Sequence, residues 1–172
     1  MGAKHGILIV IAVILVAIGV FILICRSRKD AGSFDERQVA ARGTAYKFSF
    51  ASMVVYFTCS EIVSIFLERD WATHEANLSL GICIPVFIFA ILCIVKDAYV
   101  GFKQKVISFC IPLLLIGLIN ILLAFLVNKK PVFSLSDGVL DASANFICGI
   151  TVTLIGAIVL VKFCIDRRLE DR

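Results

Sequence analysis

One carboxylate lies inside an otherwise apolar stretch of this sequence, where its charge could support chemistry. Glu61 falls in the apolar run 48–67, roughly 9 Å before the end of that run if it is helical. An ionisable side chain at membrane depth costs on the order of 2.5 kcal/mol or more and is a candidate functional site by default. Three interpretations compete: Glu61 bonds to another helix, reaches water at the nearby interface, or binds a proton or cation.

Two uncharged polar residues accompany Glu61 in the apolar runs. Asn120 lies near the middle of the run 106–127, and Ser60 directly precedes Glu61. An interhelical Asn bond contributes about 0.6–2 kcal/mol, so Asn120 is the natural partner to propose for Glu61, with a structural role. Ser60 can bond to a neighbouring helix or to its own backbone.

Catalytic and metal-binding patterns are absent from the sequence. It has no HExxH, GxSxG, P-loop or GxGxxG pattern, and its only histidines are His5 and His74. The seven cysteines fall within or at the ends of apolar runs, without a CxxC pair. We therefore expect no enzyme activity, no metal and no cofactor. Cys83 and Cys148 lie toward the same side, where a disulfide is an alternative to simple apolar packing.

The composition places these residues in a membrane protein. Of 172 residues, 60% are apolar and 17% are charged, and the mean hydropathy is +1.02. A soluble domain is closer to half apolar and a quarter charged, which disfavours soluble enzymes and nucleic-acid-binding domains. The predicted fold is all-α, a polytopic integral membrane protein formed by one domain with five transmembrane helices. The runs long enough to cross a bilayer are 7–25, 48–67, 78–95, 106–127 and 146–165.

The distribution of the 17 Lys and Arg residues predicts the orientation of these helices. Thirteen of them lie in the segments 26–47, 96–105 and 162–172. The four on the opposite side are Lys4, Arg69, Lys129 and Lys130. Basic residues accumulate in cytoplasmic loops, so we expect the N-terminus outside and the C-terminus in the cytoplasm of a plasma-membrane protein.

The longest cytoplasmic connection, residues 26–47, is expected to lie at the membrane interface. Ser33 and Glu36 fit a capping box, which predicts a short helix from Phe34 to about Arg42. Gly43 would then bend the chain into the next span. The segment either meets anionic lipid head groups or docks a protein partner. The residues assigned to this contact are Asp35, Glu36, Arg37, Gln38 and Arg42.

Small residues and prolines indicate where helices pack closely or bend. Gly149, Thr153 and Ala157 share one face of the last run at a spacing that permits close helix contact. Pro85 and Pro112 should bend the third and fourth helices. The loop 128–145 contains Gly138 and is expected to form a short re-entrant or interfacial turn.

One local pattern resembles a known group of proteins. The stretch Asp35-Glu36-Arg37-Gln38, followed by Ala41-Arg42-Gly43-Thr44-Ala45-Tyr46-Lys47 at the start of a span, is similar to a pattern in small multi-pass membrane proteins of Gram-positive bacteria. The resemblance implies a bacterial plasma-membrane protein with a cytoplasmic DERQ segment. It assigns no activity to any residue.

The sequence therefore favours a non-enzymatic membrane protein that acts through partners as an accessory, regulatory or scaffolding subunit. The first alternative is a small oligomeric transporter or channel that uses Glu61 and Asn120 within the membrane. The second is a membrane-embedded enzyme that modifies lipid. Expected partners are the lipid bilayer with its anionic head groups and either another membrane protein or a second copy of this chain, but not nucleic acid.

Overall fold

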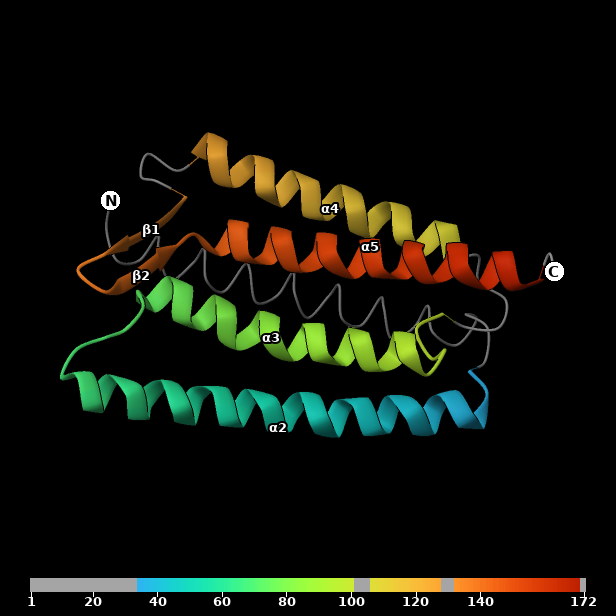
Figure 1. Ribbon diagram of the computed structural model, residues 1–172, viewed down its shortest axis with the longest axis horizontal. Coiled ribbons are helices and arrows are strands. Elements are labelled where there is room, and N and C mark those ends of the chain that lie inside the picture. The colour runs from blue at the N-terminus through green and yellow to red at the C-terminus, as the bar shows by residue number, and fades with distance from the viewer. Residues whose placement is uncertain (1–33, 101–105, 128–131, 171–172) are drawn as a thin grey trace, which may run out of the picture.

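The computed structural model describes residues 34–100, 106–127 and 132–170, which form long helices and one small hairpin (Figure 1). The helices are α2 (Glu36–Leu67), α3 (His74–Val95), α4 (Val106–Val127) and α5 (Ala144–Glu170). Strands β1 (Phe133–Ser136) and β2 (Val139–Ala142) pair antiparallel between α4 and α5. The first predicted span, residues 7–25, lies outside the described residues.

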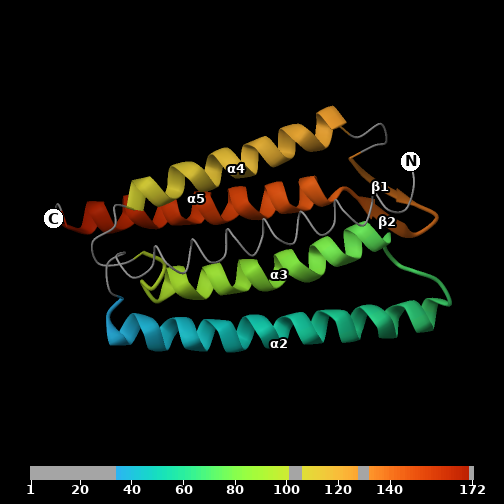
Figure 2. The ribbon, with the colours of Figure 1, turned by 180° about the vertical axis from the view of Figure 1, so that it is seen from behind.

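The four described helices run up and down, side by side, in the order α2, α3, α5, α4 (Figures 1 and 2). One end of the bundle, here called the basic end, holds the start of α2 and the end of α3. It also holds the start of α4 and the end of α5. The opposite end, here called the hairpin end, carries β1 and β2. An apolar core of Ile94, Cys110, Ile155 and Val159 joins α3, α4 and α5 nearer the basic end.

Four helices are long and apolar enough to cross a membrane, which confirms the four predicted spans that fall within the described residues. Many of their large apolar side chains point outward, including Phe50, Phe66 and Leu118. In the apolar window of α2 only 6% of the residues are buried. A helix this exposed and this apolar is suited to a lipid environment.

Helix α2 differs from its prediction, because it is one uninterrupted helix of 32 residues rather than a short helix bent into a span. Gly43 causes no bend, and no heavy atom lies within 4 Å of the position that a Cβ would take there. The helix is capped by Asp35 with Gln38, not by Ser33 with Glu36. A single Gly costs a helix only about 1 kcal/mol, which the continuous hydrogen bonding on either side offsets.

The loop before α5 also differs from its prediction, because it forms a β-hairpin rather than a simple turn. Asp137 and Gly138 have φ values of 52° and 76° and connect the strands. Two residues at positive φ form the turn whose twist matches antiparallel strands, and Asp-Gly is a preferred pair for it. The segment between α2 and α3 joins the edge of this hairpin, where the Leu140 amide donates to the Trp71 carbonyl at 2.8 Å.

Cys83 of α3 and Cys148 of α5 are in contact, with 3.5 Å between the two sulfur atoms, and both are free thiols. We expect copper-phenanthroline oxidation of the purified protein to join them, because the two sulfurs are already close to the bonding distance of about 2.05 Å. Maleimide labelling after denaturation should then count five reactive thiols in place of seven. In Cys148→Ser, the count should not change on oxidation. An unchanged count in the parent protein would show that α3 and α5 do not meet here.

Candidate functional site

Glu61, the acid that the sequence singles out, is exposed on α2 and has no hydrogen bond or ion pair with any described residue. The predicted bond between Glu61 and Asn120 is wrong. Helix α2 packs on α3, whereas α4 packs on α5 at the other edge of the row (Figure 1). Asn120 instead donates to the Ile116 carbonyl of its own helix at 2.8 Å. Within one copy of the chain, the described residues therefore do not bring this pair together.

Ser60, by contrast, is buried at the centre of a polar network near the hairpin end. Its hydroxyl accepts a hydrogen bond from the Trp71 indole N–H at 2.8 Å and donates to Asn77 Oδ1 at 3.0 Å. The Tyr56 hydroxyl donates to the same Asn77 oxygen at 2.8 Å. Sequence reasoning missed Asn77, whose role depends on the contact between α2 and α3. Because the Tyr56, Ser60 and Trp71 donors each have an acceptor, the network is suited to fixing helices in place.

Three of the five residues assigned to cytoplasmic contact are used within the protein. Gln38 donates to the carbonyl oxygens of Asp97 at 2.6 Å and of Val100 at 3.3 Å. These bonds hold the start of α2 against the segment that follows α3. The Asp35 amide donates to Gln38 Oε1 at 3.3 Å, which completes the local cap.

Arg42, the third of these residues, stacks inside the protein rather than facing outward. Its guanidinium lies 4.2 Å from the centre of the Phe34 ring, a distance typical of a cation–π contact. Glu36 and Arg37 are therefore the two assigned residues that remain exposed and are used in no described contact.

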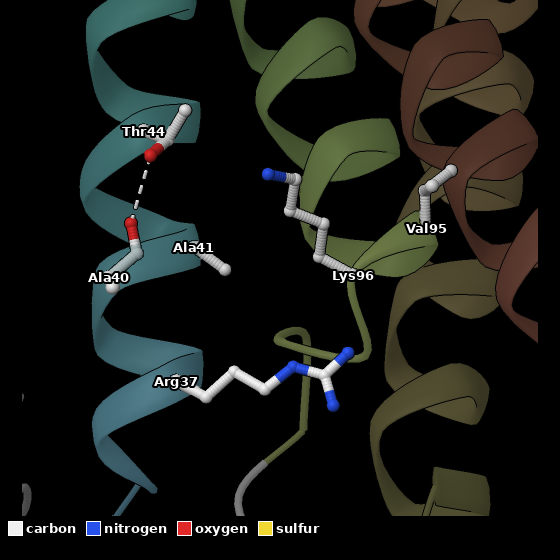
Figure 3. A pocket seen from close by; sticks show the side chains of 6 residues that line it. All are labelled: Arg37, Ala40, Ala41, Thr44, Val95 and Lys96. Atoms are coloured by element: carbon white, nitrogen blue, oxygen red, sulfur yellow. Dashed lines mark hydrogen bonds between the residues drawn. The ribbon is translucent and has the colours of Figure 1, made fainter.

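A cleft of about 350 Å³ opens between α2 and α3 beside this exposed pair (Figure 3). Arg37 from α2 and Lys96 from the end of α3 extend into it from opposite sides, so that two cations face one space. The rest of the lining is small or apolar and consists of Ala40, Ala41, Thr44 and Val95. Lys96 was not among the predicted site residues, because only the packing of α2 on α3 brings it to Arg37.

The cleft keeps its positive charge because nearby acids are engaged elsewhere or lie beyond ion-pair distance. Asp97, next to Lys96, forms an ion pair with Lys162 of α5 at 2.7 Å, and Asp166 lies 3.9 Å from the same ammonium. Among the described residues, no carboxylate oxygen is within 4.0 Å of a nitrogen of Arg37 or Lys96. Burial raises the pKa of the Tyr99 phenol, which lies in the segment after α3.

A second cavity of about 230 Å³ lies between α3, α4 and α5, and its lining is mostly apolar apart from Arg42 of α2 and Tyr99. Within the described ranges, no three His, Cys, Asp or Glu side chains are grouped so that they could hold a metal ion. Among the described residues, the cleft at Arg37 and Lys96 is thus the candidate site for a charged ligand. No protein-family model, curated protein or solved structure was found to match this chain.

Proposed function

We propose that this chain is a plasma-membrane protein with five spans that acts without catalysis, as an accessory, regulatory or scaffolding subunit. Its working surface is the start of α2, including Glu36 and Val39. In this proposal the N-terminus is outside and the basic end faces the cytoplasm. The local DERQ pattern is in keeping with a bacterial source.

The observation that carries this proposal is the length of α2. Its 32 residues extend over roughly 48 Å, whereas the hydrocarbon core of a bilayer is about 30 Å thick. A substantial part of the helix must therefore project from the membrane, or the whole helix must tilt strongly. The bonds from Gln38 to the segment after α3 hold its first turns as a rigid surface, on which Val39 is 57% exposed.

The charge at the two ends of the described bundle supports the proposed orientation. The hairpin end has a single described basic residue, Arg69. The basic end has seven, namely Arg37, Arg42, Lys47, Lys96, Lys162, Arg167 and Arg168. Basic residues near the ends of spans are retained on the cytoplasmic side.

A photocrosslinking amino acid at Val39 tests the proposal in native membranes. We expect one protein adduct, identified by mass spectrometry, that is several-fold more abundant than any adduct formed from Leu169. Leu169 is the matched control, because it is 65% exposed on α5 at the same end. The adduct should also weaken in Gln38→Ala, where the start of α2 loses its anchor.

Two results would contradict this function. One is that Val39 gives the same adducts as Leu169, which would mean that the start of α2 has no selective contact. The other is that Val39 labels only lipid. As a control for folding, each variant should elute as a single peak in detergent.

A further inference from the structure

We infer that the cleft between α2 and α3 binds the phosphate group of an anionic phospholipid from the cytoplasmic leaflet. This inference deepens the proposed function and depends on the orientation given there. It assigns a ligand class to Arg37 and Lys96 together, and it separates this lipid contact from the protein contact at Val39.

Arg37 and Lys96 place two different kinds of cation in the lining of one cleft, and this arrangement suits a phosphate. The Arg37 guanidinium offers a planar fork of N–H donors that can pair with two phosphate oxygens, and the Lys96 ammonium offers a compact charge. They come from separate helices and both extend across the cleft, with the guanidinium on the side of α3 and the ammonium at another level on the side of α2 (Figure 3). A ligand that accepts from both would link α2 to the end of α3.

The backbone adds to this attraction on the α2 side. Arg37 is the second residue of α2, in the first turn, where the helix dipole is positive and favours an anion. The C-terminal end of α3 has the opposite sign, and Lys96 at its C-cap position offsets it. Asp35 and Glu36 lie beside Arg37 in sequence, but neither forms an ion pair with Arg37 or Lys96.

The position and lining of the cleft favour a lipid over a soluble anion. It lies at the end of two helices that are long and apolar enough to cross a membrane. Ala40, Ala41 and Val95 provide apolar surface next to the cations, which inorganic phosphate could not use. A volume of about 350 Å³ is near the lower end of the roughly 300–1,000 Å³ typical of small-molecule sites, enough for a head group whose acyl chains remain in the bilayer.

Native mass spectrometry of the purified full-length protein tests this inference. The probes are phosphatidylglycerol and phosphatidylcholine with identical acyl chains. We expect the double variant Arg37→Gln, Lys96→Gln to bind the first phosphatidylglycerol about 30-fold more weakly, the combined effect of two cations near anionic lipid. Binding of phosphatidylcholine should not change.

The matched control is Arg167→Gln with Arg168→Gln, which removes the same charge from exposed positions on α5 at the same end. An equal loss in this control would overturn the inference, because it would mean that charge alone attracts the lipid. The swap Arg37→Lys, Lys96→Arg keeps both charges and should retain most of the lipid binding. Retained binding would show that the Gln variants lose the lipid because they lose charge and not because they misfold.

Competition with inorganic phosphate distinguishes a lipid phosphate group from a soluble phosphate as the ligand of the cleft. Displacement of phosphatidylglycerol by an equal concentration of phosphate would assign the cleft to a soluble anion and overturn the lipid inference. Normal lipid binding by the double Gln variant would also overturn it. In either case, an unchanged protein adduct at Val39 would still support the proposed partner function. Loss of that adduct with normal lipid binding would contradict the partner function but not the lipid site.

Discussion

Gly149→Ala is expected to destabilise the protein by about 2 kcal/mol, within the range that overpacking costs a well-packed interior. A Cβ at position 149 of α5 would lie 2.8 Å from the Ile121 amide nitrogen and 3.0 Å from the Gly117 carbonyl oxygen of α4. These are backbone atoms, so they can move away only if the two helices separate. The contact is reciprocal, since a Cβ at Gly117 would lie 2.8 Å from the Thr153 amide nitrogen.

The matched control for Gly149→Ala is Gly43→Ala, the same substitution in α2. No heavy atom lies within 4 Å of the Cβ position at Gly43, and the residue is exposed in a helix interior. There Ala should stabilise the helix by about 0.5–1 kcal/mol, so the two variants should differ in sign. Thermal unfolding of both in one detergent, followed by circular dichroism, measures the difference. A Gly149→Ala protein as stable as the Gly43→Ala protein would show that α4 and α5 are farther apart than described.

Asn77→Leu is expected to cost about 3 kcal/mol of stability and to change the surroundings of Trp71. The Ser60 hydroxyl donates to Asn77 Oδ1, and Leu would leave this buried donor without its acceptor. The Tyr56 hydroxyl would lose the same oxygen but keep the Asn77 backbone carbonyl at 3.2 Å. A buried donor that loses its partner costs about 1–3 kcal/mol, so Ser60 accounts for most of the expected loss. Trp71 is the only tryptophan of the chain and donates to Ser60, so its fluorescence reports the network directly.

Asn120→Leu provides the control for this variant, with the same change of side chain in another apolar helix. Among the described residues Asn120 bonds only within α4, so we expect a loss of less than about 1 kcal/mol and an unaltered Trp71 emission maximum. Asn77→Leu should lower the Tm and shift that maximum. If both variants unfold alike and emit alike, the hydrogen bonds of Asn77 do not join α2 to α3.

The apolar runs were sufficient to predict the long helices of the described chain. Run length and composition indicated helices at 78–95 and 106–127, and the structure has α3 and α4 there with small differences at the ends. The start of α2 was misjudged, because the sequence signals at Ser33 and Gly43 are local. The helix begins at Glu36 and continues through Gly43, and Gln38 in its first turn bonds to carbonyl groups far along the chain. The hairpin at Asp137-Gly138 had a recognisable turn signal that the prediction did not use for strands.

The candidate site could be predicted only in part. Arg37 was identified from the basic, capped segment, which is a property of neighbouring residues. Lys96 could not be assigned to the same cleft, because pairing of α2 with α3 depends on which apolar faces fit together. The same packing order separates Glu61 from Asn120, although both are polar residues in apolar runs of similar length.

By itself, the sequence determined that this protein is helical, that its described helices suit a membrane, and that its basic residues gather at one end. These properties follow from composition, run length and charge, which act locally along the chain. Only the tertiary structure decided which polar groups meet: Ser60 with Asn77 and Trp71, and Arg37 with Lys96. The physical reason is that an apolar run has no unique partner. The close fit of small residues such as Gly117 and Gly149, together with a few directional hydrogen bonds, selects the neighbours of each helix.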